Sequence, residues 1–142
     1  IPAGTPTRFA TGARCALLAL EAEDRGVLGA LAPDMRALGQ VRLARGVMGV
    51  SVTAPRDAEG GRPAFESRFF GPWVGVDEDP VTGMAHCLLG PWWHRETGAS
   101  EFRAFQGGVR KGELGVRVLG DRVHLVGSAV TVAAGELHLP PG

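Results

Sequence analysis

Glycine and proline interrupt this chain so often that few long regular elements fit between them. The sequence holds 22 Gly and 10 Pro, and these residues fall between short apolar runs. Short apolar runs bounded by turn residues are typical of β-strands, whereas a helical bundle needs long periodic segments. The chain is therefore expected to form many short strands and few helices.

The first half of the chain is expected to contain loops, strands and one short helical region. Residues 1–11 are interpreted as a loop, and Ala13–Glu21 as a buried strand, although its Ala and Leu content would also suit a helix. Val27–Leu38 has apolar residues at helical spacing. Pro33 interrupts that pattern, which favours one short helix or a turn followed by a helix starting near Ala32. Two further strands and the polar loop between them are expected over residues 47–53, 65–70 and 54–63.

The second half predicts one longer helix followed by an antiparallel meander. The helix is expected from Thr82 to about His94. Pro91 should kink or end it near that point, because proline cannot donate to the carbonyl of Cys87. Gly120-Asp121 lies between two alternating segments and is typical of a hairpin turn. The strands of the meander are expected over residues 102–105, 114–119, 122–126, 129–133 and 136–139.

These elements predict an α+β fold, with a curved, mostly antiparallel sheet wrapped around one central helix. A length of 142 residues suits a single domain, residues 1–142. Lys plus Arg and Asp plus Glu are both 15, so no net charge attracts nucleic acid. No apolar run is long enough for a membrane span, no basic leader precedes the first one, and two cysteines are too few for a disulfide scaffold. A cytoplasmic protein that binds neither nucleic acid nor membrane is expected.

The most informative motif is the acidic segment that runs into the predicted helix. Asp79-Pro80 can open that helix with Asp79 as the cap, and Thr82-Gly83 offers a second start with Thr82 as N-cap. The N–H groups at a helix start have no partner within the helix and lie at the positive end of its dipole, so they suit a carboxylate. The plain alternative is a capped core helix that holds no ligand, and the residues alone favour it.

Other chemically capable residues are better explained by structure. His86 and Cys87 are adjacent on the predicted helix and point in different directions, and His94 is eight positions away, so no metal site is expected. The acidic cluster Asp77–Asp79 is interpreted as a solvated, helix-capping turn, because a calcium loop needs more oxygen donors. Cys15 lies in an apolar run and is expected to be a small buried hydrophobe.

The segment Glu78-Asp79-Pro80-Val81-Thr82-Gly83-Met84-Ala85-His86 closely resembles the Glu-Asp-Pro-Val-Thr-Gly-Ser-Ala-His signature of PhzF-like, phenazine-biosynthesis-type isomerases. Similar stretches occur at residues 67–72, 106–114, 120–123 and 127–130. The resemblance covers about Thr11 to Leu137. Two departures stand out, because Met84 replaces the Ser of the signature and Lys111 replaces a Gly of the family pattern.

The resemblance implies a single lobe, the C-terminal one, of a diaminopimelate-epimerase-like fold. Members of that family have two similar lobes with the active site between them. It further implies proton-shuttling isomerase chemistry without metal or organic cofactor, with a first-lobe Glu acting as acid and base. On this resemblance Asp79 is the candidate catalytic residue, and Thr82, Gly83 and Met84 are candidate substrate-binding residues.

No residue of this sequence matches the catalytic Glu, so this chain alone is predicted to be inactive, because proton transfer needs a group within hydrogen-bond reach. The expected partner is an N-terminal lobe or another protein subunit; a homo-oligomer and a small carboxylated ligand stay open. The alternative is a catalytically inactive structural or protein-interaction module, favoured by Lys111 and by the weakly accepting thioether of Met84. A large exposed apolar face is expected where the first lobe should pack.

Overall fold

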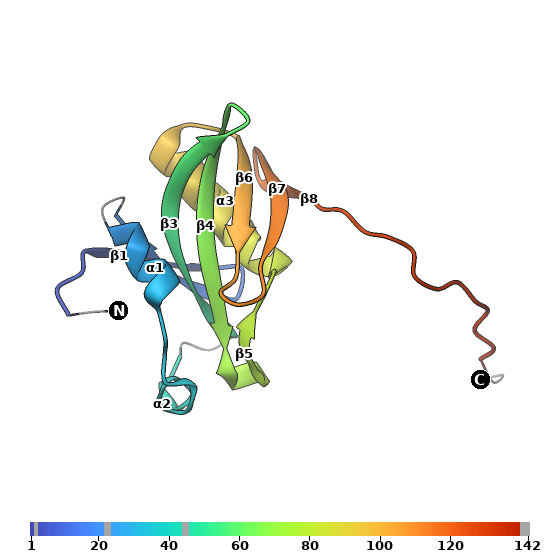
Figure 1. Cartoon of the computed structure of the whole chain (residues 1–142), viewed down its shortest axis with the longest axis horizontal. Helices are drawn as coiled ribbons and strands as arrows, with labels where there is room; N and C mark the ends of the chain where they lie inside the picture. Colours follow the sequence, from blue (N-terminus) through green and yellow to red (C-terminus); the bar gives the residue numbers. More distant parts are fainter. Residues whose placement is uncertain (2, 22–23, 44–45, 140–142) are drawn as a thin grey trace.

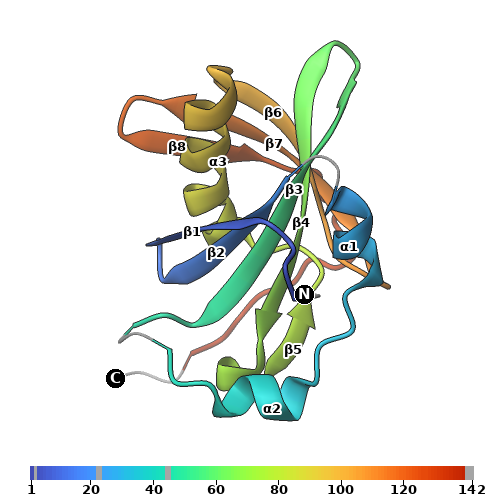
Figure 2. The same ribbon diagram turned by 90° about the vertical axis from the view of Figure 1, so that its left-hand side faces the viewer.

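One curled sheet, built in the order β1-β2-β3-β4-β6-β7-β8 with β5 also paired to β4, organises the chain (Figures 1 and 2). The computed structural model describes residues 1, 3–21, 24–43 and 46–139. The pairs β2–β3 and β4–β6 are parallel and the other neighbours are antiparallel. The expected α+β fold with a curved, mostly antiparallel sheet is confirmed. The strands are β1 (Thr7–Gly12), β2 (Cys15–Leu20), β3 (Gly49–Glu59), β4 (Arg62–Gly71), β5 (Val76–Asp79), β6 (Glu101–Gln106), β7 (Gly112–Leu119) and β8 (Arg122–Val126).

Helix α3 (Gly83–Thr97) packs against the inner face of the curled sheet (Figure 2). Phe65 of β4 stacks on the Trp93 ring with a centroid distance of 5.8 Å, and both side chains belong to the larger core cluster. The helix continues past Pro91 and ends three residues later than His94, at Thr97. The predicted end was therefore too early. Pro91 is exposed while its neighbours on the buried side are packed, so tertiary contacts hold the helix together across the lost hydrogen bond.

The outer face of the sheet carries two short helices, α1 (Arg25–Ala30) and α2 (Met35–Gln40). A second apolar cluster joins Leu28 of α1 to Phe70 of β4. The segment predicted to hold one helix thus forms two. The second starts after Asp34, whose carboxylate accepts a hydrogen bond of 2.9 Å from the Ala37 N–H, rather than near Ala32. A 3-10 turn (Pro72–Val74) joins β4 to β5.

Three predicted loops are strands in the structure. β1 begins within the expected lead-in, β5 occupies the expected acidic turn, and β3 and β4 run through the expected polar loop. The β3–β4 ribbon turns at Gly60-Gly61, where φ is +60° and +73°, as a two-residue hairpin of the mirror-image type requires. These segments are polar because they are exposed, and exposed strands lack the apolar alternation that identifies a half-buried one.

Residues 127–139 form no strand, although strands were expected over 129–133 and 136–139. The segment runs away from the sheet after β8 (Figure 1). Its apolar side chains are almost fully exposed, with Val130 at 84% and Val132 at 92%. The alternation that predicted strands is present, but within the described chain no neighbouring strand pairs with it. None of the helices in the described ranges has the length and apolar character needed to cross a membrane.

Candidate functional site

One edge of β4 carries two different strands, and the candidate site lies where they part. β6 pairs with residues 64–67 of β4, and β5 pairs with residues 69–71. The two neighbours diverge at Arg68, and the Gly107 N–H donates to the Ser67 carbonyl (3.0 Å) just beyond the last β6 pair. The turn of residues 80–82, which joins β5 to α3, therefore passes beside the end of β6.

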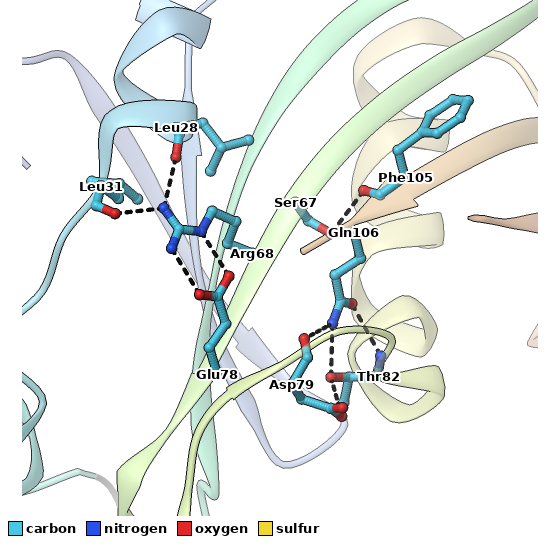
Figure 3. A network of polar contacts seen from close by, with 9 residues as sticks. All are labelled: Leu28, Leu31, Ser67, Arg68, Glu78, Asp79, Thr82, Phe105 and Gln106. Carbon is cyan, nitrogen blue, oxygen red and sulfur yellow. Dashed lines mark hydrogen bonds and ion pairs between the residues drawn. The ribbon is translucent and has the colours of Figure 1, made fainter. Parts of the chain in front are cut away.

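Gln106, the last residue of β6, holds this turn through its side-chain amide (Figure 3). Its Nε2 donates to the Asp79 backbone carbonyl (2.7 Å) and to the Thr82 hydroxyl (3.0 Å), and its Oε1 accepts from the Thr82 N–H (3.1 Å). A backbone N–H must donate and a carbonyl must accept, so these contacts fix which end of the amide is which. With 2% of its surface exposed, Gln106 is a buried polar clamp.

The Thr82 hydroxyl is turned toward Asp79 instead of the helix that it precedes. It donates to Asp79 Oδ2 at 2.7 Å, and Thr82, although the N-cap residue, makes no side-chain cap hydrogen bond to α3. Of the two helix starts considered from the sequence, the one at Thr82-Gly83 is confirmed. The first turn of α3 is therefore left without a hydroxyl cap, beside a half-buried carboxylate, and Gly83 at its tip is exposed.

A second polar cluster lies next to the first, on the outer face of the sheet (Figure 3). Arg68 binds Glu78 through two parallel hydrogen bonds of 2.7 and 2.8 Å and also donates to the Leu28 and Leu31 carbonyls at the end of α1. Hydrogen bonds from Arg68 hold the pKa of the Glu78 carboxyl below its usual value, against the opposing effect of burial. This ion pair fastens α1 and β5 to β4.

Gly108 closes over the ion pair from the β6–β7 loop. Its backbone N–H adds a small contribution to the lowered pKa of the Glu78 carboxyl. A Cβ at this position would lie 2.9 Å from both Arg68 Nη2 and Glu78 Oε1, closer than side chains tolerate. The absence of a side chain therefore lets the loop approach the pair.

The structure brings together the four residues that the sequence singled out. Asp79 and Thr82 are hydrogen-bonded to each other, Gly83 is exposed at the start of α3, and Met84 is half-buried against the larger core cluster. The sequence interpretation gave no role to Gln106. The available signal was the alternation of β6, in which Phe102, Ala104 and then Gln106 face the core, because a polar residue at a core position needs partners.

His86 and Cys15 occupy buried positions beneath this site. His86 is 0% exposed; its Nδ1 lies 2.9 Å from the Thr82 carbonyl, and its Nε2 is buried without a partner among the described residues. Burial lowers the pKa of the His86 imidazole. The expectation that Cys15 is a small buried hydrophobe is confirmed, because it is 0% exposed and desolvation, together with nearby Cys87, raises the pKa of its thiol to about 11.

Comparisons with known proteins point to one family. A family model described as "phenazine biosynthesis-like protein" matches residues 3–135. An "uncharacterized isomerase" of Pseudomonas aeruginosa is 44% identical over 117 residues, which are 82% of this chain and 42% of that protein. The mouse "phenazine biosynthesis-like domain-containing protein 2" is 44% identical over 118 residues, 80% of this chain and 41% of that protein.

A solved structure agrees with these matches. The crystal structure of a phenazine biosynthesis protein of the PhzF family from Enterococcus faecalis superposes with a TM-score of 0.76 at 34% identity. The superposition covers 96% of this chain and 49% of that one. The chain thus spans a little less than half the length of the curated relatives that it matches.

Proposed function

This chain belongs to the phenazine biosynthesis-like (PhzF) protein family, and from that membership we propose that it forms one lobe of an isomerase whose site lies between two lobes. One observation carries the proposal. The Thr82 hydroxyl donates to Asp79 and does not cap α3. The free N–H groups of the first turn of α3 therefore lie beside an acid. An uncapped helix start suits the carboxylate of a small substrate.

The roles of the candidate residues follow from their positions. The N–H groups of Gly83 and Met84 receive the substrate carboxylate, and the half-buried Asp79 lies beside them with its orientation set by Thr82. A glutamate of the partner lobe removes a proton from one substrate carbon and returns it to another, without metal or organic cofactor. Met84 contributes its backbone N–H and has no hydroxyl to add.

An apolar surface on α3 supports the presence of a partner lobe. The buried side of the helix packs on the sheet, yet its other side is also apolar, with Met84 and Leu88 half-exposed and Cys87 and Pro91 exposed. The stretch from Met84 to Pro91 is thus largely apolar around the helix, and such a stretch is typically buried on all sides. The half of the relatives that this chain does not match is the occupant that we propose for this surface.

The test uses the complete protein that carries both lobes. Asp79→Asn should lower turnover about 100-fold or more, measured as deuterium uptake from D₂O into the substrate by mass spectrometry. The matched control is Asp121→Asn, which changes an exposed acid in the β7–β8 turn and should leave turnover unchanged. The 142-residue chain alone should show no uptake. Isomerisation by that chain alone, abolished by Asp79→Asn, would contradict the two-lobe proposal.

The alternative function is an inactive structural module, which the replacement of the signature Ser by Met84 favours. Met84→Ser in the complete protein separates the two. If the family site is used, restoring the hydroxyl should leave turnover equal or higher. If neither the natural protein nor Met84→Ser shows deuterium uptake while the two lobes stay associated, the module interpretation is correct.

A further inference from the structure

A cavity of about 570 Å³ lies on the outer face of the sheet, opposite α3. In β4, Glu66 and Arg68 alternate with Phe65, and Phe65 packs in the core beneath α3, so Glu66 and Arg68 face the other side. The end of α1 forms one wall of the cavity and the β6–β7 loop forms the other. The cavity is separate from the start of α3, and its volume is typical of a small-molecule site.

Among the described residues, the cavity combines apolar surface with a positive charge that no acidic side chain matches. Leu31 lines the α1 wall, and Phe105 of β6 also lines the cavity, with the guanidinium of Arg56 4.1 Å from the centroid of its ring. Two cations of the lining are matched by acids, because Arg68 binds Glu78 and Arg56 lies 3.5 Å from Glu66. These two pairs contribute no net charge to the cavity.

Lys111 supplies the remaining charge. It lines the cavity from the β6–β7 loop, and no acidic group pairs with it in the described part of the chain. Its position is one where this sequence departs from the PhzF pattern, which has Gly there. A cation at the rim of an apolar cavity favours a ligand that carries one negative charge on an apolar body.

We propose that this outer-face cavity binds a small carboxylate with an apolar body. Lys111 pairs with the carboxylate at the rim. The apolar body lies against Leu31 and Phe105. Since the site depends on Lys111, it is a property of this chain and not of the signature at α3, and it stands whether or not the proposed isomerase function holds.

Two glycines of α1 give a matched pair of variants. A Cβ at Gly29, which lines the cavity, or at Gly26, which does not, would meet no atom within 4 Å. Gly29→Leu and Gly26→Leu should therefore both fold, and both replace glycine in a short helix. Only the first puts a bulky side chain at the cavity wall.

Benzoate is the probe, titrated into the ¹⁵N-labelled chain and followed by two-dimensional NMR. The amide signals of Gly29, Gly108 and Lys111 should shift together. Benzyl alcohol, which has the same ring without the charge, should bind about two- to fivefold more weakly, as expected for one partly exposed charge pair. Lys111→Met should weaken the binding of benzoate by the same factor and leave the binding of benzyl alcohol unchanged. It should also remove the salt dependence of benzoate binding.

Gly29→Leu should weaken the binding of both probes, whereas Gly26→Leu should leave the binding of both unchanged. Equal benzoate affinity in Lys111→Met and the natural chain would overturn the proposal, as would the absence of shifts around the cavity. Shifts confined to Gly83 and Met84 would place the carboxylate at α3, which overturns the outer-face site and supports the proposed function. Shifts around the cavity with none at α3 would support the outer-face site and leave the proposed function to its own test in the complete protein.

Discussion

Glu78 and Asp79 are neighbours in β5, yet their carboxylates serve different clusters. Successive side chains of a strand point to opposite faces. Glu78 reaches the outer face, where Arg68 binds it through two hydrogen bonds and also donates to the end of α1. Asp79 reaches the turn before α3, where its Oδ2 accepts a hydrogen bond from the Thr82 hydroxyl. The ion-paired acid thus holds the scaffold in place, and the less engaged acid is the one that we propose lies beside the substrate.

The largest effect should come from breaking the outer cluster. Arg68→Met leaves Glu78 and two carbonyls of α1 without their donor, and we expect it to lower the free energy of unfolding by about 3 kcal/mol. Urea denaturation measures the change. Arg117→Met is the control, because its pair with Glu101 is about half exposed, and the loss should be below about 1 kcal/mol. Equal losses in the two variants would mean that the outer pair is not structural.

The next effect should come from the clamp of the inner cluster. Gln106→Leu keeps a side chain of similar size but leaves the Thr82 N–H and the Asp79 carbonyl without their partner. We expect it to lower the free energy of unfolding by about 2 kcal/mol. Hydrogen exchange should also become faster in the turn of residues 80–82 and stay unchanged in α1. Gln40→Leu, at the exposed end of α2, is the control and should cost less than about 0.5 kcal/mol. Unchanged exchange in the turn would show that Gln106 does not hold it.

The difference between these clusters also explains what the sequence could predict. The α+β class, the longer helix and its start at Thr82-Gly83, one of the two starts considered, depend on local signals such as capping residues and apolar periodicity, and these were predicted. The partners Gln106 and Arg68 lie 24 residues after Thr82 and 10 before Glu78, so only the folded sheet brings them to the site. The strands expected over 129–133 and 136–139 failed for a related reason, because a strand needs a neighbour that alternation alone does not supply.

A smaller effect should come from the hydroxyl that joins Asp79 to Gln106. Thr82→Val keeps the shape of the side chain but removes one hydrogen-bond donor and one acceptor. We expect it to lower the free energy of unfolding by about 1 kcal/mol. Thr82→Ser keeps the hydroxyl and should retain both contacts. Thermal unfolding and the NMR signals of Gly83 and Met84 should therefore change in the valine variant and return toward the natural values in the serine variant. A change in the serine variant with none in the valine variant would mean that the methyl group, not the hydroxyl, holds the turn.

The smallest effect should appear as a pH dependence carried by Glu78. Because Arg68 lowers the folded-state pKa of Glu78, its pairing stabilises the fold fully above the unfolded pKa near 4.5 and is lost as pH falls through the folded value. Glu78→Gln should lower the free energy of unfolding at pH 7 but flatten its decline as the pH falls below about 5. The effect is modest because Glu78 is partly exposed and solvent screens the pair. Glu101→Gln, on the exposed rim, should leave the slope as it is. If Glu78→Gln loses stability with falling pH as steeply as the natural chain does, another group causes the acid sensitivity. Glu78 and Asp79 would then not differ in their electrostatic role.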